Sequence, residues 1–328
     1  MVLRSDIEEN RSFLKIKKDT ALEIERSFVE KLFEDFLYIV GPARSGSRVF
    51  SEAINVNPRF FSARMKMRRF ECWKKTNDID YILERMFRIP FDLLYEKIES
   101  DYVDDLKVRL SDAYKNGNFR KILACKAATH FIMDSESMDP SKYTYWTMKS
   151  NDFLGLNLCK DALKKSKYVF LIRNPHSTIL SQTTRMGRNK GLKNNKRFLL
   201  DINRASKYWC LFSRSIIEFI QKYPEDTILI RYEDFIENPE FELNRVFTFA
   251  DKTKINNNEL RFMLEQLKCS ATNHPEKYSG ISKKPLNRWS SEMKKHEVAI
   301  VKFFTSRISR QFGYQFTNIK YELTTPIL

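Results

Sequence analysis

The chain has 328 residues, which is enough for one large domain or two small ones with a sizeable hydrophobic core. Apolar residues make up 42% of it and aromatic residues 13%, a composition that excludes a disordered chain. The formal net charge of +16 favours an anionic partner, such as nucleic acid, an anionic membrane surface, or an acidic substrate or cofactor.

Hydropathy and cysteine usage bear on where the protein works. No apolar run approaches the roughly 18 residues that a membrane span needs, so we expect none. The N-terminal segment is charged where a signal peptide would need an apolar core. The five cysteines are widely spaced and form no C-x-x-C pair, which argues against a zinc site and a disulfide framework. We therefore expect a cytoplasmic protein with reduced thiols.

The predicted elements alternate between strands and helices along the chain. Residues 1–35 are typical of a charged, mostly helical lead-in, and the apolar run 36–40 predicts a buried strand. Further strands are expected at 122–125, 143–148, 168–172 and 227–231. Helices are expected at 79–99, 103–115, 152–165, 176–186, 200–222 and 239–250. This pattern predicts an α/β fold, a parallel sheet flanked by helices, in a single domain 1–328 with a helical insertion at 61–142.

The loop after the first strand, at 41–48, has the features of an anion site. A buried strand, a tight basic loop and a helix N-terminus follow one another, and the first N–H groups of a helix lack intrahelical partners. Gly46 allows the backbone to approach a ligand closely, and Arg44 and Arg48 supply charge-assisted donors. Ser47 stands where a Walker A loop requires Lys, which argues against an ordinary nucleoside-triphosphate enzyme. The alternative is an ordinary strand–turn–helix connection with two surface arginines.

A second candidate anion site follows the expected strand 168–172. Arg173 ends this strand, and Ser181 lies two turns into the helix after it. Since ligands of a doubly wound sheet bind beyond the carboxyl ends of its strands, we expect Arg173 at the same edge as the first loop. A guanidinium and a hydroxyl there suit a second phosphate. The alternative is a capping turn, because Asn174-Pro175 is a common helix entrance.

These elements, in this order and spacing, resemble the sulfotransferase superfamily. Residues 41–48 fit its 5′-phosphosulfate loop, and Arg173 with Ser181 fits its 3′-phosphate element. RYEDFIENPEFELNRVFTF at 231–249 and the segments around 287–289 and 312–314 resemble later parts of the family. The resemblance implies a P-loop NTPase-like sulfotransferase fold that transfers a sulfuryl group from 3′-phosphoadenosine 5′-phosphosulfate (PAPS) to a hydroxyl or amine acceptor. The loop is most similar to the Gly-[ST]-Arg pattern of the carbohydrate-type branch.

Position by position, the resemblance implies a set of nucleotide-binding residues. For the 5′-phosphosulfate they are Arg44, Ser45, Gly46, Ser47 and Arg48. For the rest of the nucleotide they are Arg173 and Ser181 at the 3′-phosphate, Tyr232, Ser270 near the adenosine, and Arg288 closing over a phosphate. Val49 stands where many members have a Trp that packs on adenine, which leaves the adenine partner open.

Sulfuryl transfer is an in-line displacement at sulfur, and it needs charge stabilisation and a base for the acceptor proton. The resemblance implies that Arg44, in place of a family lysine, stabilises the leaving phosphate oxygen. It implies Glu52 as the base, because glycosaminoglycan sulfotransferases place a catalytic glutamate at this offset. For Glu52 the alternative is an exposed helix carboxylate that pairs with a nearby arginine.

The segment Lys149-Ser150-Asn151 matches a family lysine but lacks the histidine base of the phenol and steroid branch. We therefore expect Lys149 in the catalytic site and a carboxylate as the base, with Asp152 and His130 as substitutes for Glu52. This scheme requires no metal, and the sequence has no cluster with metal-ligand spacing.

The acceptor is expected to be a small molecule or a glycan. The insertion carries basic and aromatic residues close together, at Arg64, Lys66, Arg68, Arg69, Phe70 and Trp73. These suit an acceptor with a flat or apolar face and an anionic group, whereas a helical lid with a simple aromatic core is the alternative. A basic nucleic-acid-binding module and a P-loop-like nucleotide kinase are the rival functions. The nucleic-acid-binding module lacks a recognised motif, so we expect no nucleic acid as a partner. The nucleotide kinase lacks the Walker lysine. The oligomeric state stays open.

Overall fold

The computed structural model describes most of the chain, in two units. The described residues are 15–31, 36–67, 91–134, 145–151, 153, 156–190, 195–251, 254–265, 268–269, 278–279, 286–316 and 321–326. One unit comprises residues 33–70 and 142–328, and the other comprises residues 1–32 and 71–141. The expected lead-in and insertion therefore overlap the second unit, and the single-domain assignment of 1–328 stays a prediction.

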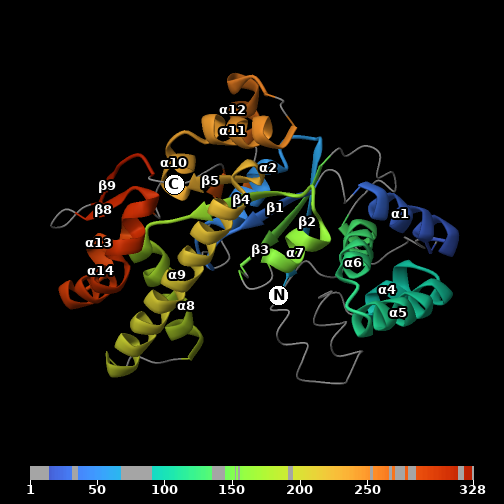
Figure 1. Ribbon diagram of the computed structural model, residues 1–328, viewed down its shortest axis with the longest axis horizontal. Coiled ribbons are helices and arrows are strands. Elements are labelled where there is room, and N and C mark those ends of the chain that lie inside the picture. The colour runs from blue at the N-terminus through green and yellow to red at the C-terminus, as the bar shows by residue number, and fades with distance from the viewer. Residues whose placement is uncertain are drawn as a thin grey trace, which may run out of the picture. The chain divides into compact units, whose positions relative to one another are not determined.

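Five parallel strands form the sheet of the larger unit, in the order β2-β3-β1-β4-β5 (Figure 1). They are β1 (Phe36–Val40), β2 (Phe60–Met67), β3 (Tyr145–Ser150), β4 (Lys167–Ile172) and β5 (Thr227–Arg231). Val40, the last residue of β1, pairs with Ser150 of β3 and with Phe170 of β4. The carboxyl ends of these strands therefore meet at one edge, and the expected α/β fold is confirmed.

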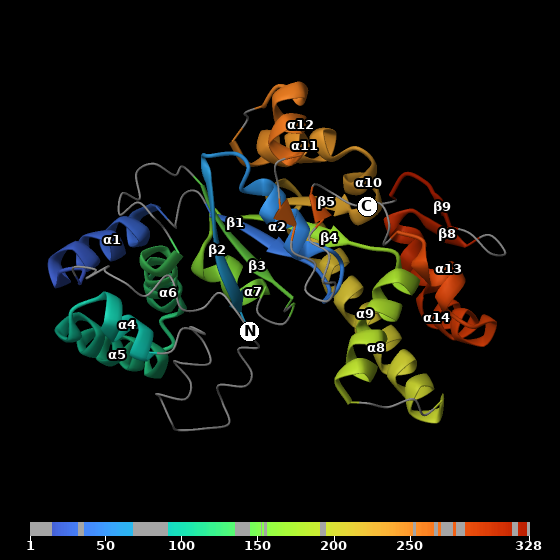
Figure 2. The same cartoon turned by 180° about the vertical axis from the view of Figure 1, so that it is seen from behind.

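Helices cover both faces of this sheet. The helices of this unit are α2 (Ser47–Ile54), α7 (Leu156–Ala162), α8 (Pro175–Lys190), α9 (Asn195–Lys222), α10 (Tyr232–Glu237), α11 (Pro239–Asp251), α12 (Asn257–Glu265), α13 (Arg288–Glu292) and α14 (Lys295–Ser309). Of these, α13 and α14 pack on α8 and α9, and α12 packs on α11. The short elements are η3 (Pro224–Asp226), η4 (Arg310–Phe312), β6 (Lys268–Cys269), β7 (Tyr278–Ser279), β8 (Tyr314–Phe316) and β9 (Tyr321–Leu323). Figures 1 and 2 show α2, α10, α11 and α12 on one side of the sheet and α8 and α9 on the other.

Alternate residues of the central strands pack against these two layers. Leu37 and Ile39 of β1 belong to a core that also contains side chains of α2, α10, α11 and α12. Tyr38, between them, meets Tyr168 of β4 edge to face, and Tyr168 lies 4.7 Å from the ring of Phe219 in α9. Because both faces are buried, these strands are continuous apolar runs in the sequence.

The second unit contains the helices α1 (Lys18–Lys31), α4 (Phe91–Lys97), α5 (Ser100–Lys115) and α6 (Phe119–Asp134). Glu25 of α1 is its buried polar centre. The carboxylate accepts hydrogen bonds from the Tyr102 hydroxyl at 2.9 Å and the Cys125 thiol at 3.2 Å, and it pairs with Arg109. A buried charge is tolerated when it is paired and hydrogen-bonded, so this cluster ties α1, α5 and α6 together.

Two expectations about this part of the chain are wrong. Residues 122–125 are not a strand but lie within α6, because Ile122, Cys125 and Thr129 fall on one buried helix face. The start of the expected helical insertion is not helical either, because residues 61–67 belong to β2, the edge strand that pairs with β3. Residues 79–90 of the expected helix 79–99 lie outside the described residues.

Candidate functional site

The loop between β1 and α2 closes tightly at Gly46. This glycine is the N-cap of α2 with φ +89°, and a Cβ added to it would overlap the ring of Tyr232. Only glycine therefore fits this position. The N-cap provides no side-chain hydrogen bond to the helix, so a ligand has access to the partial positive charge of the first turn. Arg44, two residues earlier, also has a positive φ of 74°.

Side chains from other elements hold the carbonyl groups of this loop. Asn151, just after β3, donates to the Gly41 carbonyl at 2.8 Å, and Gln182 of α8 donates to the Ala43 carbonyl at 2.7 Å. The Arg173 guanidinium donates to the Arg44 carbonyl at 3.3 Å. The loop is therefore fixed before any ligand binds. The sequence did not predict that Asn151 and Gln182 would hydrogen-bond to this loop. The position of Asn151 directly after a strand was the one feature that could have indicated it.

The structure brings the two sequence-predicted anion anchors together. Arg44 Nε donates to Ser181 Oγ at 3.0 Å, although the two residues are 137 positions apart in the chain. The Arg173 guanidinium lies 4.6 Å from the ring centroid of Tyr232, which is the ring that Gly46 accommodates. Both arginines therefore meet beyond the carboxyl ends of β1, β4 and β5.

The two serines of the loop are buried. Ser45 is 0% exposed, and its hydroxyl has no hydrogen-bond partner among the described residues. Ser47, the first residue of α2, is also buried. An unsatisfied buried hydroxyl is costly, so Ser45 Oγ is available to donate to a group bound in the loop.

Glu52 lies in the same helix as Arg48 and forms an ion pair with it. Arg48 Nε donates to Glu52 Oε1 at 2.9 Å. The second oxygen, Glu52 Oε2, is buried and has no hydrogen-bond partner within the described part of the chain. Glu52 therefore forms the ion pair with a nearby arginine that its alternative interpretation expects, and its second oxygen is left without a hydrogen bond from the described residues.

These elements carry a recognisable family pattern. Residues 37–253, more than half of the chain, match the model of the sulfotransferase family. The chain belongs to this family. No curated protein sequence matches this sulfotransferase significantly.

Solved structures of two sulfotransferase domains have a similar fold. One is from the curacin biosynthetic pathway, with 16% identity and a TM-score of 0.51, covering 84% of this chain and 98% of that domain. The other is from the olefin synthase of Synechococcus PCC 7002, with 15% identity and a TM-score of 0.54, covering 87% of this chain and 96% of that domain. At these identities they support the fold alone. The expected superfamily and sulfotransferase activity are confirmed, and the carbohydrate-type branch stays a prediction.

Of the other expected site residues, the structure describes Lys149 and Arg288 but not all of the rest. Lys149 is half-buried near the end of β3 and pairs in register with Ile39 of β1. Arg288 begins α13 and forms a two-bond pair with Glu292, at 2.6 and 2.9 Å. Ser270 and Asp152 lie outside the described residues, as does the side chain of His130 in α6.

His176, just after Arg173, is unsuited to be a base. Its Nε2 lies 3.0 Å from the Val298 carbonyl, and its ring packs on Trp289 at 4.8 Å. Burial lowers the pKa of His176 to about 4, so the ring is a weak proton acceptor at physiological pH. It is the second residue of α8, where it anchors this helix to α13 and α14.

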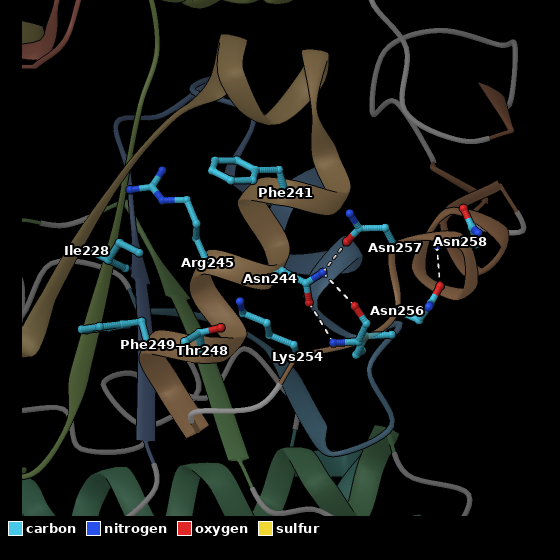
Figure 3. A pocket seen from close by; sticks show the side chains of 11 residues that line it. Ile228, Phe241, Asn244, Arg245, Thr248, Phe249, Lys254, Asn256, Asn257 and Asn258 are labelled. Atoms are coloured by element: carbon cyan, nitrogen blue, oxygen red, sulfur yellow. Dashed lines mark hydrogen bonds between the residues drawn. The ribbon is translucent and has the colours of Figure 1, made fainter.

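The pocket in Figure 3 lies apart from this site. It has a volume of about 820 Å³ and is lined by one face of α11, the start of α12 and Ile228 of β5. Asn244, which also lines it, donates to the Ile255 carbonyl at 2.8 Å and accepts the Ile255 N–H at 2.9 Å. Ile228 lies near the amino end of β5, whereas the anion loop follows the carboxyl end of β1. This pocket is therefore at the wrong edge of the sheet to hold the nucleotide.

Within the described residues, no group of three or more His, Cys, Asp or Glu side chains could hold a metal ion. Of the helices in the described ranges, none is long and apolar enough to cross a membrane.

Proposed function

We propose that this sulfotransferase takes the sulfuryl group from PAPS and transfers it to a hydroxyl or amine acceptor. The observation that carries the proposal is the 3.0 Å hydrogen bond between Arg44 and Ser181. It joins the loop that would hold the 5′-phosphosulfate to the helix that would hold the 3′-phosphate. Two anion sites this close match a nucleotide with phosphates at both ends of its ribose.

The 5′-phosphosulfate is assigned to the loop and the first turn of α2. The residues are Arg44, Ser45, Gly46, Ser47 and Arg48. The buried Ser45 hydroxyl and the uncapped start of the helix support this assignment, because both are donors suited to an anion. Arg44 stabilises charge on the leaving phosphate oxygen, and we add Lys149 at the end of β3 as a further cation of the site.

The 3′-phosphate is assigned to Arg173 and Ser181, and the adjoining part of the nucleotide to Tyr232. The stacking of the Arg173 guanidinium on the Tyr232 ring supports this, since it orients the N–H donors of Arg173. Ser270 near the adenosine and Arg288 over a phosphate remain part of the proposal on the family resemblance.

Glu52 is assigned as the base. In the proposed reaction the acceptor oxygen or nitrogen forms a bond to sulfur, the bond from sulfur to the 5′-phosphate oxygen breaks, and the acceptor proton passes to Glu52. The pair with Arg48 orients the carboxylate, and the unbonded Oε2 is the atom that would take the proton. Asp152 is the substitute base.

The acceptor is proposed to be a small molecule or glycan that carries an anionic group beside a flat or apolar face. The basic residues of 64–69 support this, of which Arg68 and Arg69 lie outside the described residues. A cytoplasmic location belongs to the same proposal, and the buried free thiols of Cys125, Cys159 and Cys210 support it.

Transfer of radiolabelled sulfate from PAPS to panels of sugars, phenols, amines and peptides tests the proposal. We expect acceptor-dependent labelling with wild-type protein. If only uncharged, apolar alcohols are labelled, and Arg68→Ala with Arg69→Ala leaves their KM unchanged, the anionic acceptor is wrong.

A further inference from the structure

The peptide unit that joins Arg173 to Asn174 is held on both of its polar sides. Its carbonyl oxygen accepts a hydrogen bond from Trp209 Nε1 of α9 at 3.3 Å. Its N–H donates to Glu233 Oε1 of α10 at 3.0 Å. Because a peptide unit is planar, with its carbonyl and N–H pointing in opposite directions, these two bonds fix its rotation. The direction in which the Arg173 side chain leaves the backbone is thereby set.

The same short helix also holds the other end of Arg173. Tyr232, next to Glu233 in α10, presents its ring to the guanidinium at 4.6 Å. One residue of the pair thus contacts the side-chain head of Arg173, and the other binds the peptide unit beside it. The carboxylate lies close enough for its charge and that of Arg173 to attract, which opposes the effect of burial on the Glu233 pKa.

Glu233 is itself held from the C-terminal part of the chain. Its second oxygen accepts a hydrogen bond from the Tyr314 hydroxyl of β8 at 2.6 Å, and Tyr314 is 0% exposed. Burial raises the pKa of both groups, and a buried carboxylate needs its hydrogen bonds to remain in place. Gly313, just before Tyr314, has φ +77°, and a Cβ there would overlap the Thr324 carbonyl, so the backbone that presents Tyr314 is also fixed.

We propose that Glu233, held by the Tyr314 hydroxyl, is a positioning residue for Arg173 and thereby sets how strongly this sulfotransferase binds the 3′-phosphate of its nucleotide. The inference rests on the proposed role of Arg173. It adds two residues, one of them more than 130 positions later in the chain than Arg173, to the determinants of nucleotide selectivity.

The test compares adenosine 3′,5′-bisphosphate with AMP, which differ only in the 3′-phosphate. Titration calorimetry of the full chain gives the ratio of their affinities for wild type, Tyr314→Phe and Glu233→Gln. We expect the ratio to fall about 3- to 10-fold in Tyr314→Phe, as for the loss of one supporting hydrogen bond, and further in Glu233→Gln. The KM for PAPS should rise while kcat stays within about twofold.

Tyr168→Phe is the matched control. Tyr168 is also a fully buried tyrosine, and its hydroxyl meets Ser166 at 3.1 Å near the amino end of β4. This variant should lose stability without changing the affinity ratio. Tyr314→Phe retains the ring, so it yields a result even where Glu233→Gln fails to fold.

The outcomes separate this inference from the proposed function. If wild type prefers the bisphosphate and Tyr314→Phe keeps that preference, the positioning role is refuted while the nucleotide assignment stands. If wild type binds both nucleotides equally, the assignment of Arg173 fails and the inference fails with it.

Discussion

Replacing Gly46 with alanine perturbs the closest packing in the site. A left-handed backbone costs a residue with a Cβ about 1–2 kcal/mol, and Gly46 has φ +89°. The new Cβ would also overlap the Tyr232 ring, and overpacking of this kind typically costs about 1–3 kcal/mol. If the Tyr232 ring moves away from the new Cβ, the Arg173 guanidinium that lies over it has to move as well. We therefore expect Gly46→Ala to lower the free energy of unfolding by about 2–5 kcal/mol and to weaken nucleotide binding.

Gly117→Ala isolates the backbone contribution. Gly117 has φ +64°, but an added Cβ would meet nothing within 4 Å. This variant should therefore lose only the first contribution, about 1–2 kcal/mol, and should bind nucleotide normally. Urea unfolding followed by circular dichroism, with nucleotide titration of each folded variant, provides both comparisons. Equal losses in the two variants, or unchanged nucleotide affinity in Gly46→Ala, would refute the close contact between the loop and Tyr232.

Three further predictions concern neighbouring groups. Adenosine 3′,5′-bisphosphate should raise the melting temperature more than AMP does, and Arg173→Ala should abolish that difference; a difference that persists would remove Arg173 from the 3′-phosphate site. Glu52→Gln should lower kcat by roughly 100-fold or more while nucleotide affinity barely changes. If Glu52→Gln turns over normally and Asp152→Asn is inactive, Asp152 is the base instead. The pKa of His176 in the folded state, about 4, lies below its usual value, so the unfolded chain binds a proton that the folded chain does not. The free energy of unfolding should therefore fall as the pH drops from about 6.5 to 4. His176→Gln should flatten this pH dependence in acid unfolding, and an unchanged slope would contradict the role of His176.

The parts of the site that the sequence predicted are those that follow directly from local pattern and strand direction. The loop at 41–48 combines a buried strand, a glycine and a helix start, and each of these has a local signature. Arg173 could be placed beside it because the carboxyl ends of parallel strands meet at one edge. Strand β5 was predicted with the bounds that it has in the structure, Thr227–Arg231, because it is a short apolar run between turn signals.

What the sequence could not predict depends on distant partners. β2, with the sequence FFSARMKM, is an edge strand without a β-branched residue, and it becomes a strand by pairing with β3 far along the chain. The run 122–125 is too short for periodicity to separate a strand from a buried helix segment. The role of Glu233 depends on its burial, with 9% of the residue exposed, which an acidic residue in a Tyr-Glu-Asp sequence does not suggest.

Displacement of bound radiolabelled PAPS tests the central claim most directly, because it requires no knowledge of the acceptor. The two anchors joined by Arg44 and Ser181 predict a single class of sites from which adenosine 3′,5′-bisphosphate displaces PAPS at concentrations where AMP and ATP do not. Failure to bind PAPS, or equal displacement by all three nucleotides, would contradict the claim that these anchors form a PAPS site.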